Sequence, residues 1–138
     1  MHILYTLKNK ILLIHESSNS KLSIEILNLE DDYRYASISE LYQEIMYQIQ
    51  SQNKDYQLIA TESTVFTSAK YDGYRILYES SEKQVLVCTY KVGDKIVLDI
   101  FEADVKYFDI LLDSVNNIIY HFNVSKEVVE LNTHSVLD

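Results

Sequence analysis

Cys88 and Asp99 have the clearest capacity for chemistry in this chain, because a thiolate is a nucleophile and a carboxylate is a general base. Strand alternation places both on one face of a predicted sheet. No histidine lies near Cys88 in sequence, so a nucleophilic role needs a base that the fold brings to it. A packing role is the simpler interpretation of Cys88, and a lone carboxylate does not define a site. We therefore expect no catalytic residues and no enzyme.

The remaining polar groups lack the spacing that metal or phosphate binding requires. The four histidines are scattered, and no pair has the separation of metal ligands. Glu30–Asp32 resembles the start of a calcium loop but lacks alternating ligands, a glycine and the final glutamate, so it predicts a solvated acidic loop. Gly73 and Gly93 are the only glycines, and neither belongs to a phosphate-binding loop. We expect no cofactor and no metal.

The charge of the chain bears on its partners. The 138 residues carry a formal net charge of −9, which disfavours nucleic acid and anionic membrane surfaces as partners. A basic protein partner and simple solubility both remain compatible with this charge. Cys88 is the only cysteine, so no intramolecular disulfide can form, which fits a cytoplasmic protein. The N-terminus does not have the pattern of a signal peptide, and no segment is apolar enough to span a bilayer.

Two amphipathic helices are predicted, at 38–52 and 104–122. Ser37 and Glu40 have the spacing of a capping box at the start of the first helix, and Asp104 is a plausible N-cap of the second. Each helix carries one apolar stripe at helical spacing: Ile38, Leu41, Tyr42, Ile45 and Ile49 in the first, and Val105, Phe108, Leu112, Val115, Ile119 and Phe122 in the second. The stripes predict that both helices pack on a sheet.

Seven strands are predicted around these helices. Three precede the first helix, at 2–7, 11–16 and 21–27, and a four-stranded ribbon lies between the helices. Asp72-Gly73 predicts a two-residue turn with Tyr71 opposite Tyr74, and Gly93 predicts a type II′ turn with Lys91 opposite Ile96. The fold class is therefore α+β, a twisted antiparallel sheet with two helices in one domain, 1–138. Residues 123–138 hold one more element, around Val128–Leu131, or a tail.

The turns divide the ribbon into two faces. The first face is apolar and predicts a core: Val65, Ala69, Tyr71, Tyr74, Ile76, Tyr78, Val85, Val87, Ile96, Leu98 and Ile100. The second face mixes apolar side chains with Arg75, Glu79 and Asp99, so another element or a partner should cover it. Five of its apolar members are the predicted partner-binding residues: Phe66, Leu77, Leu86, Tyr90 and Phe101. This hypothesis fails if the protein's own helices bury these side chains.

The order of elements resembles the PsbP/DcrB-like fold. The likeness is strongest over 58–122, where Ala69–Tyr74 matches a small residue, turn glycine and aromatic pattern. Ile100–Phe122 matches a strand that leads into a helix with Phe108 and an Ile119-x-x-Phe122 end. The resemblance implies a non-catalytic binding scaffold, as in photosystem-associated proteins, a nuclear-transport factor and chaperones of secreted bacterial toxins. In the chaperones, the sheet is expected to hold an apolar helix of the cargo.

Three classes of function follow, in order of preference. The first is a cytoplasmic protein-binding module, an adaptor or a secretion-type chaperone, that uses one face of the sheet. Its partner is a protein, and a second copy of the chain is one candidate. The second is an immunity protein that neutralises a basic toxin through acidic loops such as Glu30–Asp32. A small enzyme is the third and least favoured class.

Overall fold

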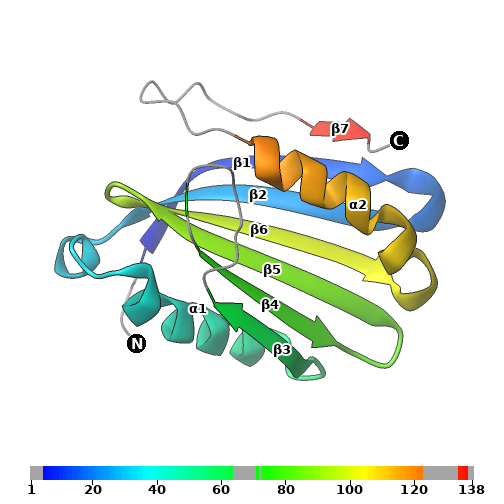
Figure 1. The fold of residues 1–138 in the computed structure, drawn as a ribbon, viewed down its shortest axis with the longest axis horizontal. Coiled ribbons are helices and arrows are strands. Elements are labelled where there is room, and N and C mark those ends of the chain that lie inside the picture. The colour runs from blue at the N-terminus through cyan, green and yellow to red at the C-terminus, as the bar shows by residue number, and fades with distance from the viewer. Residues whose placement is uncertain (1–4, 64–70, 72, 123–133, 137–138) are drawn as a thin grey trace.

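The computed structural model describes residues 5–63, 71, 73–122 and 134–136, and these residues build one twisted sheet with two α-helices (Figure 1). The strand order is β3-β4-β5-β6-β2-β1-β7. Neighbouring strands are antiparallel except for β7, which pairs with β1 in parallel. The elements are β1 (Tyr5–His15), β2 (Ser20–Leu29), α1 (Ile38–Gln52), β3 (Gln57–Ser63), β4 (Gly73–Glu79), β5 (Lys83–Val92), β6 (Lys95–Asp104), α2 (Val105–His121) and β7 (His134–Val136), with 3-10 turns η1 (Glu16–Ser18) and η2 (Asp31–Tyr33). The α+β prediction is confirmed.

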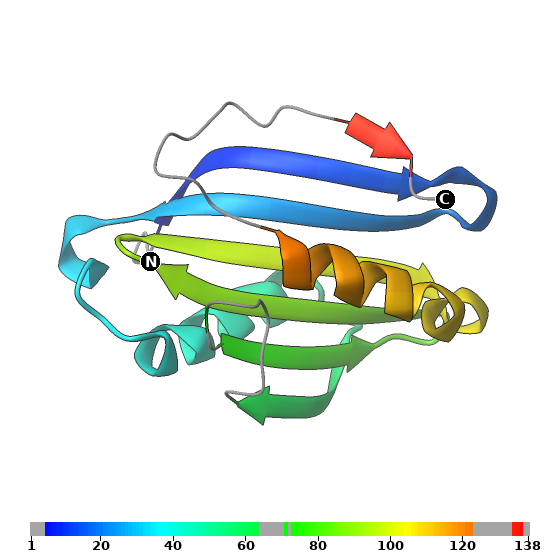
Figure 2. The same ribbon diagram turned by 45° about the horizontal axis from the view of Figure 1, so that its top comes forward.

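The two helices lie on opposite faces of the sheet (Figure 2). α1 packs on β4 and β5, whereas α2 packs on β5 and β6. Each helix therefore has its own apolar cluster. Under α1 the buried side chains include Leu41, Ile45, Ile76, Val87 and Ile96, and under α2 they include Phe108, Val115, Leu86, Tyr90 and Phe101. Alternation along the strands separates the two sets, as the sequence predicts.

The helix ends agree with the sequence. The Ser37 hydroxyl accepts a hydrogen bond from the Glu40 backbone N–H, so it caps the first turn of α1. Asp104 occupies the N-cap position of α2, but its side chain makes no capping hydrogen bond. Because the carboxylate still lies at the positive end of the helix dipole, Asp104 retains an electrostatic role there.

The first two predicted strands are one strand. β1 runs through Lys8-Asn9-Lys10 without a break, and the pairing of β1 with β2 shifts register between Leu7 and Asn9. Such a shift is a β-bulge, in which one extra residue is absorbed without ending the strand. The predicted turn after the strand is confirmed, since Glu16–Ser18 forms a 3-10 turn and Asn19 adopts a left-handed conformation with φ 54°.

One of the two glycine turns is confirmed and the other is corrected. Gly93 has φ +61°, and the strands that it joins pair Lys91 with Ile96, as predicted. At Gly73 the predicted two-residue turn is wrong, because Tyr74 pairs with Ser63, so a longer connection joins β3 to β4. The predicted partner of Tyr74, Tyr71, packs instead with the cluster under α2.

The remaining predictions on the ends of the chain lie partly outside the described residues. The element expected around Val128–Leu131 falls there, and β7 follows it at His134–Val136. None of the helices in the described part of the chain is long and apolar enough to cross a bilayer.

Candidate functional site

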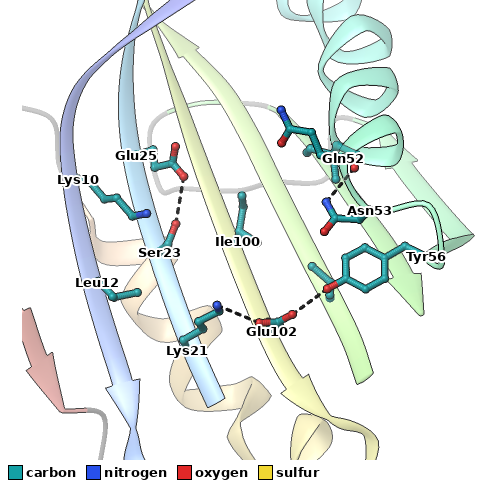
Figure 3. Close-up of a pocket in the computed structure, with 12 residues that line it drawn as sticks. Lys10, Leu12, Lys21, Ser23, Glu25, Gln52, Asn53, Tyr56, Ile100 and Glu102 are labelled. Atoms are coloured by element: carbon teal, nitrogen blue, oxygen red, sulfur yellow. Dashed lines mark hydrogen bonds and ion pairs between the residues drawn. The ribbon is translucent and has the colours of Figure 1, made fainter. Parts of the chain in front are cut away.

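A groove lies on the first face of the sheet, beside the C-terminal end of α1 (Figure 3). It has a volume of about 300 Å³. It forms where α1, which packs on β4 and β5, leaves the polar N-terminal half of β2 and the neighbouring part of β1 uncovered on this face. Its lining residues are Lys10 and Leu12 from β1, Lys21, Ser23 and Glu25 from β2, Val85 from β5, Ile100 and Glu102 from β6, Ile49 and Gln52 from α1, and Asn53 and Tyr56 from the segment after α1.

The groove combines an apolar floor with a polar rim. Val85 is buried, and Leu12 and Ile100 are half-buried, so the floor offers apolar contact surface. The rim holds both signs of charge, with Lys10 and Lys21 opposite carboxylates of β2 and β6. Lining of this kind is typical of a surface that buries an apolar group of a ligand and hydrogen-bonds its polar atoms.

Glu102 is the centre of the polar network in the groove. The Tyr56 hydroxyl donates a hydrogen bond of 2.7 Å to one oxygen of the Glu102 carboxylate. Lys21 Nζ lies 3.3 Å from the other oxygen, and Lys83 Nζ lies 3.8 Å from the first. The network therefore joins the segment after α1 to β6, β2 and β5, and it fixes one wall of the groove.

The pKa values of this pair reflect the network. Burial alone raises the pKa of Glu102, but the hydrogen bond from Tyr56 and the charge of Lys21 outweigh burial, so the net pKa is below its ordinary value. The pKa of Tyr56 is raised, mainly by burial and then by the hydrogen bond to Glu102. These shifts favour the anionic form of Glu102 and keep the Tyr56 hydroxyl as a hydrogen-bond donor at neutral pH.

The polar side of the groove arises from β2. Lys21, Ser23 and Glu25 alternate with the buried Leu22 and Ile24, so the N-terminal half of β2 is polar on the first face and apolar on the second. Pairing places this polar side next to Ile100 and Leu98 of β6, since Ser23 lies opposite Ile100 and Glu25 opposite Leu98. The sequence indicates that β2 is half-polar, but it does not show that β2 neighbours β6. The groove was missed for this reason.

The two residues singled out for chemistry lie together on the second face. Cys88 and Asp99 are directly opposite one another on β5 and β6, and both have no exposed surface. Neither oxygen of Asp99 has a hydrogen-bond partner in the described part of the chain, and burial raises the pKa of Asp99 well above its ordinary value. Burial without a polar partner disfavours the carboxylate form that a general base requires, so this geometry does not support Asp99 as the base for Cys88.

The predicted partner-binding residues lie largely inside the protein. Leu86, Tyr90 and Phe101 retain 4%, 0% and 0% of their surface and belong to the cluster under α2. Leu77 is half-buried against the same cluster, and Phe66 lies outside the described residues. The prediction that this set forms an open docking surface is therefore wrong for its described members. The reason is that α2 covers the face of the sheet on which they lie.

The side chain of His15 has a structural role in the turn between β1 and β2. His15 Nδ1 lies 2.7 Å from the Ser18 hydroxyl, which donates to Ser20, so these residues stabilise the β1–β2 turn. In the sequence, this hydrogen-bonded turn is indicated by a histidine that is followed by serines at a predicted turn.

The acidic loop is solvated as predicted, since the Asp31 side chain is 91% exposed and pairs with Arg34. No metal-binding group of histidine, cysteine or acidic residues is found among the residues that the structure describes.

Comparison with known proteins finds similarity in structure and none in sequence. No family model matches the chain, and no curated protein matches it. PA94 of Pseudomonas aeruginosa, a protein of unknown function, is similar with a TM-score of 0.63 and 6% identity, over 86% of this chain and 83% of that protein. Cyanobacterial PsbP (CyanoP) of Synechocystis sp. PCC 6803 is similar with a TM-score of 0.51 and 15% identity, over 72% of this chain and 64% of CyanoP.

The fold is therefore α+β and similar to that of PsbP, which confirms the broad resemblance in fold seen in the sequence. At these identities the likeness extends to the fold alone. Neither neighbour assigns an activity to the groove.

Proposed function

We propose that this chain is a non-catalytic protein-binding module, an adaptor or a secretion-type chaperone, that holds a segment of its partner in the groove. The observation that carries the proposal is the uncovered part of the first face, where α1 leaves an open hollow of about 300 Å³ between its own end and the strands β1, β2 and β6. The apolar floor accepts an apolar side chain of the partner, and the rim hydrogen-bonds the backbone around it. The proposal includes a cytoplasmic location, which the lone cysteine supports.

The test needs a partner and a variant that changes only the groove. Capture of tagged protein from the native organism identifies candidates, and binding is then measured between purified components. Leu12→Asp places a charge on the floor, so we expect at least a tenfold weaker Kd, because an apolar contact becomes a desolvated carboxylate. The matched control is Ile110→Asp, where the side chain is 72% exposed on α2, the helix on the opposite face of the sheet (Figure 2).

The two variants separate the outcomes. Unchanged binding by Leu12→Asp, with its circular dichroism spectrum intact, contradicts the groove as the binding surface. Loss of binding by Ile110→Asp alone would instead place the partner on the outer side of α2. Capture of a protein whose binding is not weakened by Leu12→Asp does not support the proposal.

An immunity protein is the second candidate, and the exposed acidic loop favours it. Asp31 and Asp32 are both exposed on η2, and the chain carries a net charge of −9. This function predicts tight binding to a basic protein that weakens steeply with salt. The double variant Asp31→Asn/Asp32→Asn should then lower the association rate while Leu12→Asp leaves it unchanged, which is the opposite of the result expected for the groove.

A further inference from the structure

Three polar atoms are sealed between α2 and the sheet. They are the two carboxylate oxygens of Asp99 and the hydroxyl oxygen of Tyr90, and none has a hydrogen-bond partner among the residues that the structure describes. Both residues have no exposed surface. Burying a polar group without a partner costs free energy, and burying an ionised one costs much more. The contact between α2 and the second face therefore contains a local source of instability.

The groups around Asp99 leave it without a compensating charge. On β5, Cys88 lies directly opposite and Tyr90 lies two residues further along the same face. On β2 the opposite residue is the apolar Ile24. Tyr71 stacks on Tyr90 with ring centroids 5.6 Å apart, and the α2 side chains in this cluster are apolar: Phe108, Leu111, Leu112, Val115, Ile118 and Ile119, with Phe122 just beyond the helix.

The nearest cation by strand pairing is Arg75 on β4, which lies opposite Cys88 and is therefore one strand further away. No ion pair among the described residues includes Asp99. Tyr90 stays neutral through the accessible pH range, because burial, and then the carboxylate of Asp99, raise the pKa of its phenol. Among the described residues, Asp99 is thus a titratable group of this face that has no ion-pair partner.

Ionisation of Asp99 should act on α2 and spare α1. α2 follows β6 without a linker, and its N-cap residue Asp104 makes no side-chain hydrogen bond that would hold the first turn. α1 packs on the opposite face, against a separate apolar cluster. A charge on Asp99 can therefore be hydrated if α2 lifts from the second face, while the contacts of α1 remain.

We propose that α2 is a pH-sensitive cover of the second face: it lies closed while Asp99 is protonated, and ionisation of Asp99 favours its release. Release would expose Leu86, Tyr90 and Phe101, which are apolar and interior in the closed state. This inference concerns the face opposite the groove, so it does not depend on the proposed function.

The sign of the effect follows from the direction of the pKa shift. Burial raises the pKa of Asp99 in the closed state, so the closed state binds the proton more tightly than the open state does. The preference for the closed state is complete below about pH 4, the ordinary pKa of an aspartic acid. It falls by up to about tenfold per pH unit as the pH rises to the closed-state pKa, and it is constant above that value.

The experiment follows α2 and the thiol beneath it as a function of pH. The hydrogen-exchange rates of the α2 and α1 amides are divided by their intrinsic rates at each pH. The rate of Cys88 alkylation is divided by the rate in the urea-unfolded chain, which removes the effect of pH on the thiolate fraction. In the wild type we expect the protection of α2 and Cys88 to fall up to about tenfold per pH unit above pH 4, while α1 stays protected. Asp99→Asn should make both profiles flat, because the amide does not ionise. If the Asp99→Asn variant does not fold, Asp99→Val is used in its place.

Three results would overturn the proposal. The first is a wild-type protein in which the protection of α2 and Cys88 does not change with pH, and this result is sufficient whatever the variants show. A pH dependence that survives in Asp99→Asn would belong to Cys88 or to another group. Loss of protection in α1 together with α2 would mean that Asp99 acts on unfolding of the whole domain and not on release of the helix.

Discussion

The hydroxyl of Tyr56 donates a 2.7 Å hydrogen bond to the carboxylate of Glu102, a residue 46 positions later in the chain. Tyr56 belongs to the short segment between α1 and β3, and Glu102 lies near the end of β6. The bond therefore fixes the position of the α1 end relative to the centre of the sheet. It also closes one side of the groove, where Lys21 holds the same carboxylate from the other direction.

Removing this hydroxyl should lower stability measurably. Tyr56→Phe deletes the donor and keeps the ring, so we expect a loss of about 1 kcal/mol in the free energy of unfolding, toward the lower end for a bond to a charged group because the site is partly hydrated. Urea denaturation measures the loss. The matched control is Tyr35→Phe, where the side chain is 90% exposed and the change should stay within about 0.5 kcal/mol. Equal losses in both variants would show that the bond contributes nothing.

The stability that Glu102 provides should disappear in acid. Its pKa lies below its ordinary value of 4.5 in the folded protein, so its contribution is complete above that value and is lost as the pH falls through the folded pKa. We expect Glu102→Gln to be about 1 kcal/mol less stable than the wild type at pH 7, because two ion pairs lose their anion. The difference should shrink toward zero below pH 4 in urea titrations at several pH values. A difference that is constant from pH 7 to pH 3 would contradict the assigned network.

Features that depend on neighbours in sequence were predictable. The limits of α1 agree with the predicted helix because a serine cap and an apolar stripe are local signals. The register of β5 and β6 follows from one turn, since Gly93 has the positive φ that a type II′ turn demands. The division of side chains between the two faces then follows from alternation, which explains why Val87 and Leu86 fall in separate clusters.

Features that depend on distant strands were not predictable. The first face was expected to be a complete core, yet it contains the groove, because β2 brings Ser23 and Glu25 beside β6. The second face was expected to need a cover, and α2 provides it. The pairing of β2 with β6 joins residues about 75 positions apart, and no turn between them sets the register. The site therefore depends on the part of the topology that local signals do not determine.

The two helix caps should differ in strength. Ser37 accepts a hydrogen bond from the Glu40 N–H, so Ser37→Ala should cost about 1 kcal/mol. Asp104 makes no such bond, so Asp104→Ala should lose only its interaction with the helix dipole, about 0.5 kcal/mol. Thermal unfolding of both variants at low salt measures the difference. Added salt should reduce the loss in Asp104→Ala and leave the loss in Ser37→Ala, and the reverse pattern would contradict the geometry of both caps.

Gly93 should resist substitution for a backbone reason alone. Its φ is +61°, and a Cβ built there has no atom within 4 Å, so steric contact with the rest of the protein does not oppose a side chain. We expect Gly93→Ala to lose about 1 kcal/mol, because a residue with a Cβ disfavours positive φ. Gly93→Asn should lose less, since asparagine tolerates this region. If alanine and asparagine cost the same in urea denaturation, the strain comes from the lost flexibility and not from the sign of φ.

Thr89 offers a place where a polar atom can be removed with benefit. Its hydroxyl is buried on the first face of β5 with no hydrogen-bond partner among the described residues, and the residue has no exposed surface. Thr89→Val keeps the shape and replaces the hydroxyl with a methyl group, so we expect the free energy of unfolding to rise by about 1 kcal/mol, the lower end of the cost of an unsatisfied buried group. Thr89→Ser is the control, because it keeps the hydroxyl and deletes a buried methyl group, and it should lose about 1 kcal/mol. Urea denaturation at pH 7 compares the three proteins. A valine variant less stable than the wild type would show that the Thr89 hydroxyl has a partner in solution.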